Sequence, residues 1–305
     1  MSLDPDNSLL NSILTTRLGK PFQPQCKACQ DLGIVFESNL NPGQGGRDAG
    51  TYELCGCQER LTRCDGQAPW MYSDRSGRTM RACPSRPARV KLERLRHLYK
   101  RSDIPRRYQG SFFSSIRPDQ VHTDLMLAVE QSIELIAHMD HPDSVKGLYL
   151  YGPTGCGKTL LSCAILNEIL RVFVLPVKYA KISRDILGRL QSTFNPNSDI
   201  YGAGKKIEAE LGSVPALVID DLGVQRETEW ANQVLYDLID TRYENDLLTV
   251  FTSNEPMESW RGIAGGRVLS RLREMCREFP IQMPDYREQI HADIQSRNLG
   301  PWGPA

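Results

Sequence analysis

The sequence lacks both a long apolar run and an excess of charge of either sign. Its 37 Lys and Arg residues balance 37 Asp and Glu residues, so the formal net charge is zero. No stretch approaches the ~20 apolar residues that a membrane-spanning helix requires. The first residues, Met1 to Lys20, are polar and include early acids, which does not fit a signal peptide. We therefore expect a cytoplasmic globular protein that does not interact with a membrane.

The charge is less even locally. Between Arg60 and Arg107 the chain has fourteen Lys and Arg residues but only four Asp and Glu residues, a local excess of ten positive charges. Two interpretations are open: a solvated linker, or a surface for a phosphate backbone or an acidic partner. Apolar residues at three- and four-residue spacing predict a short basic helix over 88–101. Ile104-Pro105 would separate it from the next segment.

Cysteine is concentrated near the N-terminus. Cys26 and Cys29 form a C-x-x-C pair, and Cys55 and Cys57 form a C-x-C pair. Four thiolates at this spacing are typical of a structural Zn²⁺ site, and a small turn-rich domain needs such a cross-link to be stable. Two alternatives remain: Cys64 in place of one ligand, or an iron–sulfur cluster, which uses the same residue type. The other cysteines fit ordinary thiols: Cys83, Cys156, Cys163 and Cys276.

From about residue 121 onward, short apolar segments alternate with helical patterns. The expected strands are 148–151, 177–181, 216–219, 247–252 and 279–283, and the expected helices are 159–173, 183–191 and 230–243. Short apolar strands separated by helices predict a parallel sheet covered on both faces. The expected fold class is therefore α/β, with a five-stranded parallel sheet preceded by a small cysteine-rich domain.

A glycine-rich loop follows the first expected strand. Residues 152–159 read Gly-Pro-Thr-Gly-Cys-Gly-Lys-Thr, which fits the G-x-x-x-x-G-K-[ST] pattern of a phosphate loop. The glycines let backbone N–H groups face the phosphates, and the helix beginning at Thr159 adds its dipole. Lys158 would reach the β- and γ-phosphates of ATP, and Thr159 would ligate Mg²⁺. The expected nucleotide-binding residues are Gly152, Pro153, Thr154, Gly155, Cys156, Gly157, Lys158, Thr159 and Leu160.

Polar residues follow two later strands, at the sheet edge where the phosphate loop also lies. Asp220 is expected to hold magnesium through water. Asp221 is expected to orient or deprotonate the attacking water, the alternative being a charge at a helix N-terminus. Asn254 is expected to hold the same water through its amide, the alternative being a simple turn. This set predicts an ATPase; a small-molecule kinase and a purely structural nucleotide site remain as alternatives.

An arginine-containing segment lies further on. Residues 265–272 read Gly-Gly-Arg-Val-Leu-Ser-Arg-Leu. Arg267 is the candidate for a residue that reaches the nucleotide of a neighbouring subunit, with Arg271 as the second candidate and a surface ion pair as the alternative.

Together these motifs resemble the DnaC/DnaI/IstB family of AAA+ ATPases, which are bacterial replicative helicase loaders and related ATPases of some transposons. The resemblance covers roughly residues 104–287. Its most specific parts are the Asp220-Asp221-Leu-Gly sequence, the 265–272 segment and the absence of a helical lid, since only about twenty residues follow Met283. The pattern around Cys26 and Cys29, with Asp and Gly two and four residues after the second cysteine, is similar to the zinc-bearing N-terminal domain of DnaI-type loaders.

The resemblance implies an organisation and a set of cofactors. Residues 1–87 would form a zinc-binding domain that contacts a hexameric replicative helicase, and residues 88–118 a basic helix and linker. Residues 119–290 would form an AAA+ ATPase domain without a lid, and residues 291–305 a loosely ordered tail. The implied cofactors are ATP, Mg²⁺ and Zn²⁺. A site that lacks its own lid would be completed by a neighbouring subunit, so self-association on ATP is expected.

The resemblance also implies a DNA-binding helix after the second strand. The matching positions include Arg184, Arg189 and Phe194, which would contact single-stranded DNA, although Phe194 is equally compatible with a core position. The expected function is an ATP-dependent loader of the helicase in replication initiation or restart. The alternative is an IstB-like transposition regulator that binds duplex DNA and a transposase.

Overall fold

The computed structural model describes residues 13–15, 24–38, 50–74, 76–116, 122–139, 141, 146–223 and 228–283. The chain divides into two compact units. The first comprises residues 1–115 with 163–179, and the second comprises residues 116–162 with 180–305. The predicted tail 291–305 and the predicted absence of a lid after Met283 lie outside the described residues.

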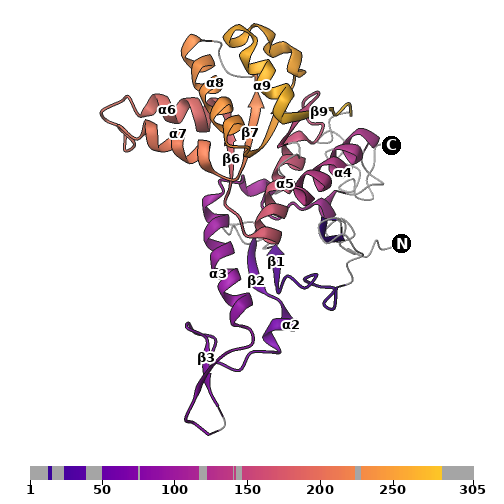
Figure 1. The fold of residues 1–305 in the computed structure, drawn as a ribbon, viewed down its shortest axis with the longest axis vertical. Helices are drawn as coiled ribbons and strands as arrows, with labels where there is room; N and C mark the ends of the chain where they lie inside the picture. The colour runs from indigo at the N-terminus through magenta and orange to yellow at the C-terminus, as the bar shows by residue number, and fades with distance from the viewer. Residues whose placement is uncertain are drawn as a thin grey trace, which may run out of the picture. The chain divides into compact units, whose positions relative to one another are not determined.

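A five-stranded parallel sheet forms in the chain from residue 147 onward, as predicted (Figure 1). The strand order is β6-β7-β8-β5-β9. The strands are β5 (Gly147–Tyr151), β6 (Val177–Lys181), β7 (Ala216–Leu222), β8 (Leu248–Ser253) and β9 (Cys276–Pro280). Strand β5 pairs in parallel with both β8 and β9, and β7 pairs in parallel with β8. The loops after β5, β7 and β8 therefore lie at one edge of the sheet.

Helices precede and connect these strands. They are α4 (Thr123–Ala137), α5 (Lys158–Phe173), η4 (Ile182–Gly188), α6 (Arg189–Ser192), α7 (Gly204–Ser213), α8 (Glu229–Glu244), η5 (Met257–Gly266) and α9 (Arg267–Met275). The N-terminus of α8 is capped by Thr228, whose hydroxyl oxygen accepts the Ala231 N–H at 3.1 Å. Helices α6 and α7 lie side by side (Figure 1), and Leu190, Ile207 and Leu211 join one buried cluster.

Two predicted elements need correction. The last strand is β9 at 276–280 and not 279–283, because Cys276 to Pro280 pair with the residues of β5. Ile281 and Met283 are buried but lie beyond the strand, and this burial explains why their apolar pattern resembles a strand. The helix predicted over 183–191 begins as the π-helix η4 and becomes α-helical only at α6. Helices α2 (Gly56–Glu59), α4, α7 and α9 were not predicted.

The first unit contains two hairpins and a long helix. Strands β1 (Ile34–Ser38) and β2 (Gly50–Leu54) are antiparallel, as are β3 (Met71–Ser73) and β4 (Met80–Ala82). Two short 3₁₀ turns, η1 (Arg106–Tyr108) and η2 (Phe113–Ser115), lie after the long helix. The short helix α2 (Gly56–Glu59) follows β2, and α3 (Arg86–Arg101) contains the predicted basic helix. The hairpins were not predicted, since the sequence there contains many turn residues.

Aromatic side chains pack the β1–β2 hairpin against α3 and the segment after it. The ring of Phe36 contacts those of Tyr52, Tyr99 and Phe112 edge-to-face, with centroids 5.1–5.9 Å apart. Gly110 has φ +76°, and a Cβ there would lie 2.2 Å from Cε1 of Phe36. The close approach of the backbone to this ring therefore requires glycine.

The segment after α3 is held by the second half of α5. Asn167 donates from Nδ2 to the carbonyl oxygens of Tyr108 and Ser111, at 3.0 and 2.8 Å. The Glu168 carboxylate, which is fully buried, accepts the N–H of Phe113 at 3.2 Å and pairs with Arg171 at 2.7 Å. The hairpin, α3 and this part of α5 therefore form one packed unit. Within the described ranges, no helix has the length and apolar character needed to cross a membrane.

Candidate nucleotide and metal sites

The predicted phosphate loop connects β5 to α5. Gly155 and Gly157 have φ values of +83° and +93°, which favour glycine. Lys158 is 8% exposed, and its ammonium donates to the carbonyl oxygens of Gly152 and Pro153, each at 2.8 Å. No carboxylate pairs with Lys158 among the described residues. Its charge is therefore held by neutral oxygens at the N-terminus of a helix, an arrangement that fits a phosphate group.

Strand β7 brings Asp220 next to this loop. Asp220 is fully buried, and its Oδ1 accepts hydrogen bonds from the hydroxyls of Thr159 at 3.0 Å and Thr252 at 2.6 Å. Asp221 is partly exposed, and its N–H donates to Thr252 Oγ1 at 3.0 Å. Carboxylate and hydroxyl oxygens are the ligands that Mg²⁺ prefers. Thr159 and Asp220 therefore lie together, and their chemistry suits the predicted magnesium site.

Asn254 follows β8 and lies beside the phosphate loop. Its Oδ1 accepts a hydrogen bond from Lys158 Nζ at 3.2 Å. Two further contacts orient this end of β8: Tyr149 OH donates to the Glu255 carbonyl oxygen at 3.0 Å and accepts the indole N–H of Trp260 at 2.9 Å. The structure thus places Asn254, Lys158, Thr159, Asp220 and Asp221 at one edge of the sheet.

Sequence reasoning missed Lys181 and Thr252 at this site. Lys181 ends β6 and pairs with the carboxylates of both Asp220 and Asp221. Burial by itself would lower the pKa of Lys181, but the hydrogen bond to Asp221 and the two negative charges raise it. Both residues could have been found from the sequence, because each lies near the end of a predicted strand. Neighbouring parallel strands end at one edge of the sheet, where the aspartates also lie.

The two candidate arginines differ in their surroundings. Arg271 pairs with Asp240 at 2.8 Å, and its guanidinium lies 4.2 Å from the ring centroid of Tyr243. Arg267 donates to the Ala264 carbonyl oxygen at 3.0 Å and lies 4.5 Å from the ring centroid of Tyr236. In the described part of the chain, no carboxylate pairs with Arg267. Of the two arginines, Arg267 is therefore the one whose charge is not already paired with a carboxylate in the described part of the chain.

The candidate DNA-contacting residues lie on η4, α6 and the turn after α6. Arg184 is 72% exposed and pairs with Asp185 through two contacts, at 2.6 and 2.9 Å. Arg189 is partly exposed. The side chain of Phe194 is 70% exposed, so it is not a core residue. Tyr201, which the sequence reasoning missed, is also 62% exposed in the turn before α7.

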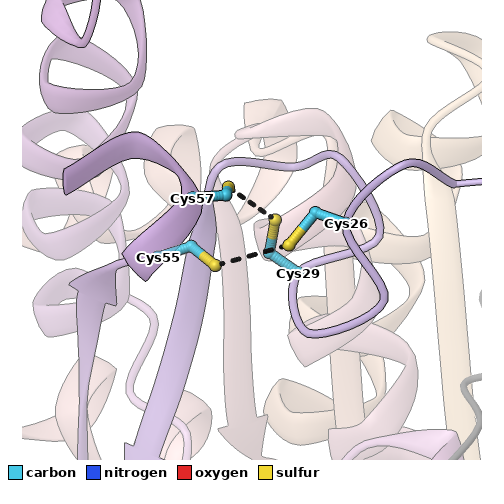
Figure 2. Close-up of side chains that lie close together, drawn as sticks. All are labelled: Cys26, Cys29, Cys55 and Cys57. Atoms are coloured by element: carbon cyan, nitrogen blue, oxygen red, sulfur yellow. Dashed lines mark hydrogen bonds between the residues drawn. The ribbon is translucent and has the colours of Figure 1, made fainter. Parts of the chain in front are cut away.

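Four thiols converge in the first unit. Figure 2 shows Cys26 and Cys29, from the turn before β1, facing Cys55 and Cys57, which lie at the start of α2. The four sulfur atoms all lie within 4.8 Å of one another. The Sγ atoms of Cys26 and Cys55 are 3.8 Å apart, and those of Cys29 and Cys57 are 3.6 Å apart. Tetrahedral zinc with bonds of ~2.3 Å requires sulfur atoms ~3.8 Å apart. The predicted ligand set therefore fits zinc, and Cys64 is not part of this cluster.

The surrounding chain holds the thiols in place. The Asp31 carboxylate accepts the N–H groups of Gln25 and Cys26 at 3.0 and 2.8 Å, which closes the turn that carries the first pair. Gly33 has φ +77° and donates its N–H to Cys29 Sγ at 3.4 Å. The Cys26 thiol has its pKa lowered to about 7, chiefly by the backbone N–H of Cys29. Backbone N–H donors of this kind stabilise metal-bound thiolates.

The fold and the phosphate site define a P-loop nucleotide-binding protein of the AAA+ type, and comparisons with known proteins agree. The crystal structure of the DnaC helicase loader has a TM-score of 0.50 at 24% identity and covers 58% of this chain and 99% of its own. The structure of the replication initiator DnaA bound to AMPPCP and single-stranded DNA has a TM-score of 0.50 at 18% identity, covering 65% and 58%. At such identity, these likenesses show the fold alone.

Comparison with related sequences identifies the family within this class of protein. The replicative helicase loader DnaC of Escherichia coli K12 is 25% identical over 59% of this chain and 70% of its own length. An insertion sequence ATP-binding protein, y4pL of Sinorhizobium fredii, is 27% identical over 50% of this chain and 61% of its own. The family model of IstB-like ATP-binding proteins matches residues 123–293. The chain therefore belongs to this family, within the DnaC/DnaI/IstB group of AAA+ proteins. The cysteine cluster lies outside the matched range.

Proposed function

We propose that this chain hydrolyses ATP. The supporting observation is the hydrogen-bonded set that joins Lys158 to Asn254 and Thr159 to Asp220 at one sheet edge. In this proposal the loop 152–160 binds the triphosphate, and Lys158 contacts its β- and γ-phosphates. Thr159 and Asp220 would hold Mg²⁺, which, when bound, would neutralise part of the phosphate charge. Asp221 and Asn254 would orient the attacking water.

We further propose that the chain loads a hexameric replicative helicase onto single-stranded DNA. Its membership of a family that includes proteins named as replicative helicase loaders supports this role. The fit of Cys26, Cys29, Cys55 and Cys57 to zinc adds support, because the resemblance to DnaI-type loaders implies a zinc-binding domain that would contact the helicase. In this proposal, residues 1–87 contact the helicase, and residues 119–290 bind ATP and self-associate. Residues 88–118 link these two parts.

Mass photometry of the chain mixed with the replicative helicase of its host and Mg·ATP tests this role. We expect a discrete species several chains heavier than the helicase hexamer. Lys158→Ala should abolish phosphate release and deplete this species, whereas Lys205→Ala, an exposed lysine on α7, should change neither. A helicase that stays alone with the wild-type chain would contradict the loader role. Equal phosphate release by the wild type and Lys158→Ala would contradict hydrolysis at this site.

A second candidate is a transposition regulator, as the match to an insertion sequence ATP-binding protein suggests. This function predicts ATP-dependent binding to duplex DNA and to a transposase encoded nearby. A chain that ignores the helicase but binds duplex DNA more tightly than a single strand of the same length would favour it.

We propose Arg184, Arg189 and Phe194 as single-stranded DNA contacts. Arginines bind phosphates, and an exposed aromatic ring offers a stacking surface. Neutralising both arginines should reduce the slope of log affinity against log salt by up to ~0.7 per lost phosphate contact. Phe194→Ala should weaken DNA binding without changing that slope. The control is Leu127→Ala, at an exposed apolar residue on α4, which should change neither the affinity nor the slope. If the arginine variant keeps the wild-type slope, the DNA contacts lie elsewhere.

A further inference from the structure

A second pair of cysteines lies outside the proposed zinc site. Cys83 directly follows β4 and is buried, whereas Cys64 lies in the segment after α2 and is partly exposed. The N–H of Arg63 donates to Cys83 Sγ at 3.2 Å, and the thiol of Cys64 donates a further hydrogen bond to the same sulfur. The two thiols are therefore neighbours in the fold, although they lie 19 positions apart in the sequence.

Hydrogen bonds hold the two segments that carry these thiols side by side. The hydroxyl of Thr62 donates to Oγ of Ser85 at 3.0 Å. Arg89 on α3 donates to both of these hydroxyl oxygens, at 3.3 Å to Thr62 and 3.2 Å to Ser85. The N–H of Cys83 donates to the Trp70 carbonyl oxygen at 2.9 Å. Folding by itself therefore brings the two sulfur atoms together.

The surroundings of Cys83 favour its thiolate. Burial by itself would raise the pKa of this thiol, but hydrogen bonds from the Arg63 N–H, from Ser85 and from Cys64 lower the pKa to about 6. Cys83 also lies just before α3, and the N-terminal end of a helix favours a negative charge. At neutral pH Cys83 is therefore mostly thiolate, and the Cys64 thiol is one of its hydrogen-bond donors.

A thiol next to a thiolate supplies both partners of a disulfide, and a peroxide supplies the oxidant. The partly exposed sulfur of Cys64 attacks one oxygen of the peroxide while its proton passes to Cys83. The O–O bond breaks, and the hydroxide that leaves takes this proton to become water. Cys83, again a thiolate, attacks the sulfenic sulfur of Cys64, and the S–O bond breaks to release a hydroxide that solvent protonates. The two thiols lose two electrons and the peroxide gains them.

We propose that Cys64 and Cys83 form a redox-active pair, separate from the zinc site, that a hydroperoxide converts to a disulfide. The link closes the segment 65–82, which contains the hairpin of β3 and β4, at the point where α3 is about to begin. Exchange with a thiol such as glutathione reopens it, so the modification is reversible. The proposal involves neither nucleotide nor DNA, and it stands independently of the proposed ATP hydrolysis and helicase loading.

The test uses the full chain as purified, without added chelator. A stoichiometric amount of hydrogen peroxide is added, free thiols are alkylated, and tryptic peptides are identified by mass spectrometry. Trypsin leaves the two cysteines on separate peptides, 64–75 and 82–89. We expect most chains to yield these peptides joined, lighter than their sum by two hydrogen atoms, and separable by reduction. A chromogenic chelator should detect no release of zinc.

Variants separate the two thiols. Cys83→Ser should leave Cys64 as a sulfenic acid, which dimedone traps, and Cys64→Ser should lose the linked peptides altogether. Cys276→Ala, which removes a buried thiol on β9, is the control and should form the link as the wild type does.

Three results would overturn the proposal. In the first, both cysteines of the wild type remain fully open to alkylation after peroxide treatment. In the second, zinc is released while peptides 64–75 and 82–89 stay separate, since the oxidant would then act on the zinc cluster and not on this pair. In the third, the chain holds a second zinc ion that Cys64→Ser loses, since the pair would then be part of a metal site.

Discussion

Each thiol of the cysteine cluster depends on a few short-range contacts. Asp31 closes the turn that carries Cys26 and Cys29, and Gly33 supplies a left-handed backbone and an N–H donor to sulfur. The second pair is fixed where β2 passes into α2, since the Cys55 N–H donates to the Gly33 carbonyl oxygen at 3.0 Å. The two halves of the cluster therefore position each other.

We expect one zinc ion per chain. Cys29→Ser should reduce the zinc content after dialysis to a small fraction of this value, because serine is a poor ligand for Zn²⁺ and only three thiolates remain. The metal is measured by mass spectrometry of the purified protein. Cys64→Ser is the matched control and should retain its zinc. Equal zinc contents in these two variants would refute the four-thiolate site. Iron in place of zinc would mean that the cysteines hold an iron–sulfur cluster.

At the scale of elements, α5 has two functions along its length. Its first residues form part of the proposed phosphate site. Its second half holds the segment after α3 through Asn167, Glu168 and Arg171. The guanidinium of Arg171 also lies 4.4 Å from the ring centroid of Phe112, which belongs to the aromatic cluster of the hairpin. The aromatic cluster of the hairpin is thus packed against the second half of α5.

Glu168→Gln should destabilise the chain markedly. A fully buried carboxylate would be lost while Arg171 remains, and breaking a buried pair in this way costs about 3–5 kcal/mol. Thermal unfolding measures the effect, and trypsin cleavage in the Arg106–Arg107 turn should become faster. Glu134→Gln removes an exposed carboxylate that pairs with Arg277 at 3.2 Å, and its loss should cost less than about 1 kcal/mol. Similar losses of stability in both variants would mean that the buried pair does not hold this segment.

At the scale of the whole molecule, the question is whether one chain forms a complete ATPase site. Arg267 follows three consecutive left-handed residues, Ala264 to Gly266, which turn the chain sharply before α9. Its guanidinium packs on Tyr236 without a carboxylate partner in the described ranges. An arginine presented in this way suits the proposed contact with the nucleotide of a neighbouring subunit.

Arg267→Ala should retain binding of the fluorescent ATP analogue but lose most phosphate release. Asp221→Ala subunits should also be inactive, yet a mixture of the two variants should recover activity. In the mixture, an Arg267→Ala subunit keeps its own Asp221 and receives an arginine from its neighbour. Arg271→Ala, which removes a surface ion pair, is the control and should keep most of its activity. A mixture as inactive as its parts would show that Arg267 does not act between subunits.

The sequence by itself determined the features that depend on neighbours along the chain. The phosphate loop, the Asp220-Asp221 pair and the two cysteine pairs are local patterns, because their spacing fixes which groups can meet a phosphate or a metal. Strand–helix alternation likewise fixed the parallel sheet. The boundaries of the last strand were misplaced, because burial of Ile281 and Met283 beyond β9 produces the same apolar pattern as a strand.

Only the tertiary structure decided which distant residues meet. Lys181 lies 39 positions before Asp220 in the sequence, yet β6 and β7 are neighbours in the sheet and end at the same edge. The exposure of Phe194, the pairing of Arg271 with Asp240 and the burial of Glu168 under the segment after α3 also depend on contacts between elements. Local periodicity carries no information on such contacts, because they are set by strand order and by the packing of one element on another.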